Sequence, residues 1–447
     1  MAVAPKPMEL PTESVPDHLR RRFGDELPKH LPFGVHKTVV AMTKTKIGPL
    51  EFVELNAPTF VEAHKRLGEL SRTEILENLD MKLSKIDDEE LAKQIRFIRG
   101  SRKAMDAKLG DGRINQDIRR TLGEYFESLK AWSEGAQFYR FITERQRIGG
   151  MLVDGQKITE EDLALWLQLD TFGCQTGLLR GGDGSVKIWH SEEWPTDEVK
   201  KAQILSFKIG AGKTSEEIYA FHYPYLLPGS AFSWRPDGFA QGFDSLYLKP
   251  AFQEGASLAN VAVWVSLRLG GSRSLAEVIR SLGPFSDGCA ISTVRREGGR
   301  VVGERVEFAG DKINETVLPA EPGGMLFQVN LVSDPQSDLA KIYEIVDEGY
   351  RGKEGRYRDA LDWRVGRMNR VLKRVKSLKG EPTTEDLRRI LAFTGGPVVD
   401  GNVWSTANPD VKGQFTARIS PESMGVLTWS GPATKKDAVV EFVYKTE

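Results

Sequence analysis

The sequence predicts an α+β protein, in which a mostly helical N-terminal segment, residues 1–173, precedes a strand-rich part, residues 174–447. Apolar residues recur at i, i+3 and i+4 spacing from Pro58 to Arg147, which is typical of amphipathic helices. After Gly173, short β-branched and aromatic runs alternate with glycine-rich turns, which is typical of strands. This second part has strands at both ends and helical patterns between them. We therefore expect packed sheets with helices outside.

The N-terminal segment divides into an arm, a hairpin and a series of helices. Residues 1–35 are rich in proline and charge and are expected to form an arm or linker. Residues 36–55 carry β-branched residues on both sides of a Gly-Pro pair, which predicts a hairpin. After the long helical stretch, Thr159 is a suitable N-cap, because three acidic residues, 160–162, follow it in the first turn.

The strand-rich part opens with a hairpin around a GGDGS turn. The apolar run 259–271 fits either a strand or a helix, and residues 336–378 and the segment after Thr384 have helical patterns. Further strands are expected within residues 201–210, 216–227, 230–236, 239–248, 289–310, 325–332, 403–409, 414–423, 424–431 and 438–445.

Composition excludes several classes of protein. The 447 residues include 62 Lys plus Arg and 63 Asp plus Glu, and the formal net charge of −1 disfavours nucleic-acid binding by bulk electrostatics. Two cysteines are too few for a disulfide scaffold or a four-cysteine zinc site. No apolar run is long enough to cross a membrane, and the N-terminus lacks the apolar core of a secretory signal. We expect a cytoplasmic protein with neither nucleic-acid nor membrane partners.

One familiar binding motif is incomplete in the sequence, and two familiar catalytic motifs are absent from it. The run GAGKT, Gly210–Thr214, ends like a phosphate loop, but the glycine required five residues before Gly212 is Phe207. The six histidines form no HExxH motif and have no cysteine partners at ligand spacing, and no GxSxG elbow is present. We therefore expect no metal and no cofactor.

Cys174 is the remaining candidate for chemistry. A cysteine is most often a small buried apolar residue, and Cys289 is interpreted in that way. Cys174, however, follows a glycine at the start of a strand–turn–strand unit that ends in two acidic residues and a tryptophan.

The stretch GCQTGLLRGGDGSVKIWHSEEW resembles the nucleophile hairpin of N-terminal-nucleophile (Ntn) hydrolases, and in particular the acyl-coenzyme A:6-aminopenicillanate acyltransferase-like family. Weaker similarities occur in the family's order: KAWSEGAQ, HSEEW, the YPYLLPG stretch, SRSLAEVIRSL, FQVNLVSDP and GRYRDAL. The resemblance implies a four-layer αββα sandwich. It also implies autocatalytic cleavage between Gly173 and Cys174, so that residues 1–173 become a propeptide or α subunit.

The resemblance implies roles for further residues. Cys174 would be the nucleophile, and its freed α-amine would be the base, because a thiol attacks an amide well only as the thiolate. Asn330 would donate to the oxyanion, Glu193 would orient the amine and Arg356 would lie near the nucleophile. Each of these three also has an ordinary structural alternative: a strand-end Asn, a surface carboxylate and a helix Arg.

Substrate contacts are assigned more loosely. Trp194 and Trp234 are candidates for an aromatic acyl pocket, although aromatics on strands more often belong to a core. Asp244 matches a family Asn. Departures from the family pattern include Gln175 directly after the nucleophile and Ser191 in the HSEEW segment.

Three functions follow from these observations. The first is a cysteine amidohydrolase that cleaves a small N-acyl compound through an acyl-thioester. The second is an acyltransferase or amide-forming enzyme of the same fold, and the third is an uncleaved homologue with a binding or non-hydrolytic role. The expected partner is a small-molecule amide or acyl donor, and homo-oligomerisation stays open. The two parts should remain associated, because the helical segment has an apolar face to bury.

Overall fold

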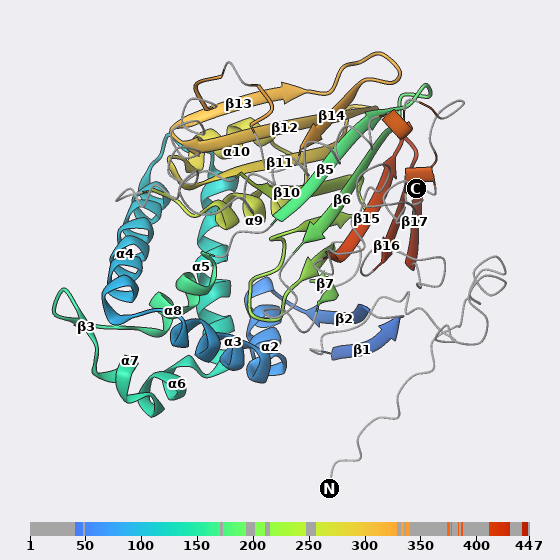
Figure 1. Ribbon diagram of the computed structural model, residues 1–447. Coiled ribbons are helices and arrows are strands. Elements are labelled where there is room, and N and C mark those ends of the chain that lie inside the picture. Colours follow the sequence, from blue (N-terminus) through green and yellow to red (C-terminus); the bar gives the residue numbers. More distant parts are fainter. Residues whose placement is uncertain are drawn as a thin grey trace, which may run out of the picture.

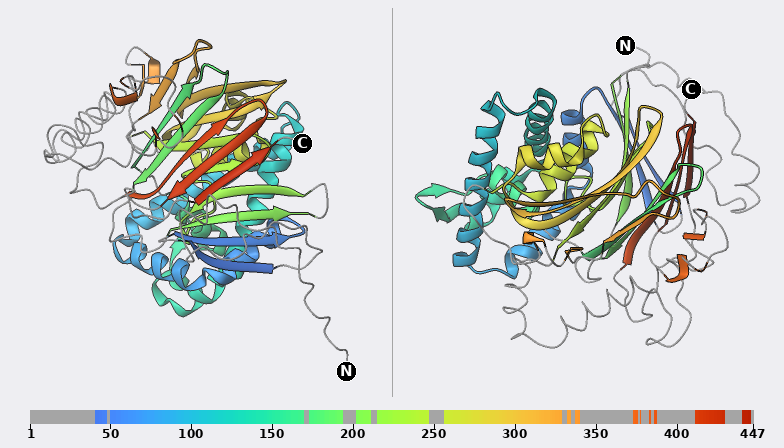
Figure 2. Two further views of the ribbon diagram at one scale, coloured as in Figure 1. Left: turned by 90° about the vertical axis from the view of Figure 1, so that its right-hand side faces the viewer. Right: turned by 90° about the horizontal axis from the view of Figure 1, so that it is seen from above.

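Two β-sheets lie face to face, and helices cover the outer face of the larger one (Figure 1). The view from above in Figure 2 shows the helices, the larger sheet and the smaller sheet as successive layers. The protein is therefore of the α+β class. The structure is a computed structural model that describes residues 41–47, 50–169, 173–193, 202–210, 215–246, 256–328, 332–334, 337–339, 373–375, 377, 383, 386–387, 411–429 and 440–445.

The larger sheet has nine strands among the described residues, in the order β1-β2-β7-β8-β9-β10-β11-β12-β13. Neighbouring strands are antiparallel except β2 and β7, which run parallel. The strands are β1 Ala41–Ile47, β2 Leu50–Ala57, β7 Gln203–Ile209, β8 Glu216–His222, β9 Phe232–Arg235, β10 Phe239–Ser245, β11 Phe285–Glu297, β12 Arg300–Gly310 and β13 Lys312–Val317.

The smaller sheet is antiparallel, with the described strands in the order β14-β5-β6-β15-β16-β17. Its strands are β5 Gly173–Arg180, β6 Val186–Glu193, β14 Met325–Gln328, β15 Val411–Ile419, β16 Ser423–Trp429 and β17 Val440–Lys445. A separate two-stranded ribbon joins β3 Leu152–Val153 to β4 Gln156–Lys157. Strand β10 of the larger sheet packs against β5 and β6 of the smaller one.

Five of the described helices begin at residues whose side chains satisfy free backbone N–H groups. The side chains of Thr59, Asp87, Asn115 and Ser274 accept such bonds, and Thr159 forms a full capping box with Asp162. The helices are α2 Phe60–Leu70, α3 Arg72–Ser84, α4 Asp88–Gly110, α5 Gln116–Ala136, α6 Phe138–Glu144, α7 Gln146–Gly150, α8 Glu160–Leu167, α9 Ala259–Leu269 and α10 Leu275–Leu282. None of the helices in the described part of the chain is both long and apolar enough to span a bilayer.

The N-terminal segment shares the layers of the strand-rich part. Strand β2 pairs with β7 over the seven positions from Glu51↔Gln203 to Ala57↔Ile209, so the N-terminal hairpin forms one end of the larger sheet (Figure 1). Helices α2 and α5 pack on each other, α5 packs on α9, and α9 packs on β9, β10 and β11. One continuous cluster of buried apolar side chains joins Val53 near the start of the described chain to Phe442 near its end.

Most predicted elements that fall on described residues are confirmed. The hairpins expected in 36–55 and 289–310 are β1–β2 and β11–β12, and the helix after Thr159 is α8. The ambiguous run 259–271 is helix α9, which Gly270 ends in a left-handed conformation. The helical prediction for 336–378 and the one after Thr384 lie largely outside the described residues, although residues 338–339, 373–375, 377 and 386–387 are helical.

Candidate active site

Cys174 is the second residue of β5 and is fully buried between the two sheets. Side chains alternate along a strand, so Cys174 shares a face with Thr176 and Leu178. Thr176 bonds Asp244 of β10, and Leu178 lies near Gly303 of β12, which places this face against the larger sheet. The Cys174 thiol therefore points between the sheets, close to the point where β5 begins.

Glu192 of β6 lies directly opposite Cys174 in the β5–β6 hairpin. The Cys174 thiol donates to Glu192 Oε2 over 2.9 Å. The Tyr223 hydroxyl donates to the other oxygen, Oε1, over 3.0 Å, and His190 Nε2 lies 3.1 Å from Oε2. One buried carboxylate thus contacts a thiol, a phenol and an imidazole.

His190 is held in place through its second ring nitrogen. Its Nδ1 lies 2.8 Å from Thr176 Oγ1, and Thr176 in turn donates its hydroxyl proton to Asp244. Because that proton is used, the Thr176 oxygen must accept, so His190 Nδ1 carries the N–H. Burial lowers the pKa of His190 to about 3, so the ring is neutral near pH 7.

Gly242 of β10 permits this close approach of the two sheets. A Cβ at Gly242 would lie 2.7 Å from Thr176 Oγ1 and 2.9 Å from His190 Nδ1. On the neighbouring strand, the Phe232 ring packs on His190 and stacks on Phe415 of the smaller sheet. The site is therefore a polar cluster on β5 and β6 of the smaller sheet. Gly242 and Phe232 of the larger sheet lie against it.

The predicted site residues are only partly described. Gly173 begins β5, where its backbone pairs with that of Glu193 at the end of β6. Asp244 belongs to the polar cluster. A chain of hydrogen bonds runs from Asp244 through Thr176, His190 and Glu192 to Cys174. The Glu193 side chain and the residues Trp194, Asn330 and Arg356 lie outside the described part of the structure.

Trp234 lies in a buried aromatic stack. Its ring is parallel to Tyr219 at 5.0 Å between centroids and to Phe415 at 6.3 Å, and its indole N–H donates to Tyr444. This stack joins β8, β9 and the smaller sheet, so the side chain is part of the packing between the sheets.

Sequence reasoning missed Glu192, His190, Thr176 and Tyr223. The hairpin register contained the signal for the first of these residues. The GGDGS turn sets Arg180 opposite Val186, and counting back from that pair sets Cys174 opposite Glu192. Spacing along the sequence does not indicate that His190 lies near Cys174, because the two residues come together from adjacent strands.

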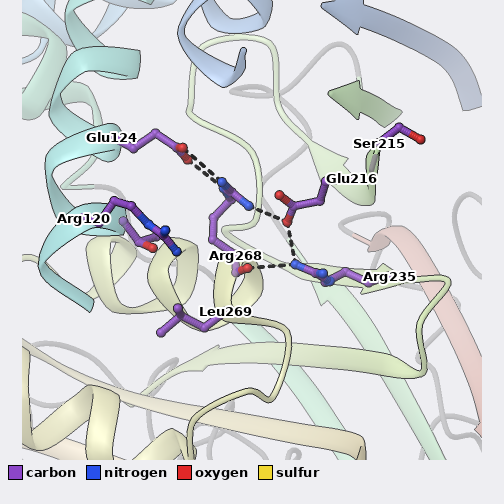
Figure 3. A pocket seen from close by; sticks show the side chains of 8 residues that line it. Arg120, Glu124, Ser215, Glu216, Arg235, Arg268 and Leu269 are labelled. Atoms are coloured by element: carbon purple, nitrogen blue, oxygen red, sulfur yellow. Dashed lines mark hydrogen bonds and ion pairs between the residues drawn. The ribbon is translucent and has the colours of Figure 1, made fainter. Parts of the chain in front are cut away.

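A cavity of about 610 Å³ lies on the helical side of the larger sheet, and Cys174 is not among its lining residues. Figure 3 shows the ion pairs that cross it: Arg268 bonds Glu124 of α5 and Glu216 of β8, and Arg235 of β9 bonds the same Glu216. Arg268 also lies over the Phe60 ring. These charged groups neutralise one another and connect α5, α9 and the larger sheet.

No protein-family model matches the chain, and no curated protein is significantly similar to it in sequence. Function must therefore be argued from the site itself.

Proposed function

We propose that the protein is a cysteine amidohydrolase of the Ntn type, with Cys174 as its nucleophile. Two observations support this proposal. Cys174 lies near the start of a strand, on the face between two packed sheets, and its thiol bonds a buried carboxylate 2.9 Å away. The second observation carries the proposal, because a carboxylate that accepts a hydrogen bond from the thiol is placed to take up its proton as the sulfur attacks.

The reaction begins with cleavage of the peptide bond between Gly173 and Cys174. The thiol attacks the Gly173 carbonyl and displaces the Cys174 nitrogen, and water then hydrolyses the resulting thioester. The products are residues 1–173 and a second chain whose α-amine belongs to Cys174. An α-amine has an unperturbed pKa of roughly 7.7–8.0, so it accepts the thiol proton near neutral pH.

The same sequence of steps acts on substrate. Cys174 Sγ attacks the amide carbonyl, the C–N bond breaks, and the leaving amine takes the proton. Water then hydrolyses the acyl-thioester and releases the acid. Glu192 holds the thiol by its hydrogen bond. Asn330 is proposed to donate to the oxyanion and Arg356 to lie near the nucleophile, and both are outside the described residues.

The fold, substrate class, cellular location and cofactor requirement expected from the sequence are also proposed for the protein. The fold would be the four-layer αββα sandwich. The substrate would be a small N-acyl compound, and the protein would be cytoplasmic and need no cofactor for this reaction.

Release of free amine from a panel of N-acyl compounds tests this function. The wild-type protein should release amine, and Cys174→Ala should release none. Cys289→Ala should retain activity, because Cys289 lies in β11 and is not a member of the bonded Cys174–Glu192 pair. Equal activity in the wild-type and Cys174→Ala proteins would refute the proposal. A new amide formed from an added amine, at the expense of free acid, would identify an acyltransferase instead.

A further inference from the structure

Three atoms with lone pairs converge beside β5. Cys174 Sγ, His190 Nε2 and Glu192 Oε2 all lie within 4.8 Å of one another, and all three residues are fully buried. Thiolate, imidazole and carboxylate are the three ligand types that bind Zn²⁺ in proteins. All three side chains come from two adjacent strands, β5 and β6, and none comes from a loop.

The hydrogen bonds of His190 leave one of its ring nitrogens facing the thiol–carboxylate pair. Because Thr176 donates its hydroxyl proton to Asp244, it accepts from His190 Nδ1. The other ring nitrogen, Nε2, lies 3.1 Å from Glu192 Oε2, the same oxygen that the Cys174 thiol contacts over 2.9 Å. A sulfur, a nitrogen and a carboxylate oxygen therefore face one another, as the ligands of one cation do.

The surrounding groups resemble an outer shell of metal ligands. The His190 ring is oriented by Thr176, which Asp244 fixes in turn. Tyr223 orients Glu192 by donating to Oε1, whereas His190 contacts Oε2. Outer-shell hydrogen bonds of this kind set the tautomer of a ligating histidine and the direction of a ligating carboxylate.

We propose that Cys174, His190 and Glu192 bind one divalent transition-metal ion, with Zn²⁺ as the preferred ion. Cys174 binds as the thiolate and releases its proton to solvent, His190 binds through Nε2 and Glu192 through Oε2. Two ligand charges then balance the charge of the ion, so the three ligands and the metal form a neutral buried unit. The fourth tetrahedral position is left to water or another ligand.

The ion competes with the thiol chemistry proposed above. A thiolate that shares its electron pair with Zn²⁺ is not available to attack a carbonyl, so the metal acts as a reversible inhibitor. This inhibition rests on the proposed function, whereas metal binding itself requires neither cleavage nor activity.

Cobalt titration of the full-length protein, stripped of metal by a chelator, tests the site. We expect one equivalent of Co²⁺ to produce a thiolate-to-cobalt charge-transfer absorption that Zn²⁺ then abolishes. Cys174→Ser should lose this absorption, and Glu192→Gln and His190→Gln should each weaken binding at least about tenfold. Cys289→Ser is the matched control and should bind like the wild-type protein, because Cys289 is a buried strand cysteine outside the cluster.

Thr176→Val tests the site without changing any of the three proposed ligands, so the test does not depend on whether the ligand variants fold. It preserves the side-chain shape but removes the hydroxyl that orients His190 and donates to Asp244. It should lower cobalt affinity about 10- to 100-fold with an unchanged far-ultraviolet circular dichroism spectrum. Absence of the absorption from folded wild-type protein would overturn the proposal. Its persistence in Cys174→Ser would do the same, as would wild-type affinity in both Glu192→Gln and Thr176→Val.

The intact mass of the same samples separates this proposal from the proposed function. A self-cleaved protein without cobalt absorption would remove the metal site and leave the hydrolase. An uncleaved protein that binds cobalt through Cys174 would leave the metal site and remove the hydrolase.

Discussion

Glu192 is the residue at which the groups of the candidate site meet, since Cys174, His190 and Tyr223 all contact its carboxylate. The family resemblance points instead to Glu193 as the orienting carboxylate. Consecutive strand residues direct their side chains to opposite faces, and Glu192 is the one that pairs with Cys174 across the hairpin. The two positions can therefore be tested against each other.

We predict that Glu192→Gln slows self-cleavage about 10²-fold or more, because the amide keeps the size of the side chain but accepts the thiol proton poorly. Glu193→Gln should have the smaller effect. The measurement is the rate at which full-length protein disappears, followed by mass spectrometry. A larger effect of Glu193→Gln would return the orienting role to the residue that the family resemblance indicates.

His64 gives a pH-dependent contribution to folding stability. It lies in α2 between the Phe207 and Trp264 rings, and its Nδ1–H donates to the Phe60 carbonyl. Burial, with a smaller contribution from Arg268, lowers its pKa to about 4. As the pH falls from about 6.5 to about 4, the unfolded chain binds a proton that the folded protein does not, so the folded state loses stability.

We predict that protonation of this histidine in the unfolded chain lowers the free energy of unfolding by roughly 2 kcal/mol when the pH is lowered from neutral to about 5. Urea denaturation at both pH values, on wild-type protein and His64→Leu, measures the effect. The wild-type protein should lose more stability than the variant on acidification. Because His190 and His222 are present in both proteins, equal losses would show that His64 is not held neutral.

At the scale of elements, helices α2 and α5 cross at two glycines. A Cβ at Gly68 would lie 2.1 Å from the Trp132 carbonyl oxygen, and a Cβ at Gly135 would lie 2.1 Å from that of Lys65. Each glycine thus lies against the backbone of the other helix, which cannot give way as a flexible side chain does.

Gly135→Ala should therefore lower the free energy of unfolding by about 2 kcal/mol or more. Gly123 in the same helix is the control, because its Cβ would lie 3.8 Å from a Leu109 methyl group. Gly123→Ala should be neutral or stabilising by up to about 1 kcal/mol, since alanine favours helix more than glycine does. Equal effects in chemical denaturation would contradict the close crossing.

The sequence predicted elements best where the signal is local. The cap of α8 was readable because Thr159 and Asp162 interact within one turn. Helix α9 could not be distinguished from a strand, because it is buried on nearly every side and its apolar residues show no clear period. Glu192 was missed for a different reason, since its role depends on strand register rather than on residue type.

At the scale of the whole molecule, the N-terminal segment is bound to the rest by backbone as well as side-chain contacts. Strand β2 continues the larger sheet through β7, while Asn260 donates to the Gln168 carbonyl and Gln168 Oε1 accepts from the Leu227 N–H. Sequence patterns predicted the apolar helices but not the parallel β2–β7 pair, because that pairing joins residues about 150 positions apart.

We predict that residues 1–173 and 174–447 remain together after cleavage. Ladder hydrogen bonds and a shared apolar core resist separation, so both parts should elute as one species from a sizing column without denaturant and separate when denaturant is added. An N-terminal part that elutes alone under native conditions would contradict the shared core.

Self-cleavage before Cys174 is the central claim, and the intact mass of denatured protein tests it most directly. Wild-type protein and Cys289→Ala should each yield two chains of 173 and 274 residues, and Cys174→Ala should remain a single chain of 447. A single uncut chain in freshly purified and in long-incubated wild-type protein would contradict the account, because Cys174 would then have no α-amine to act as its base.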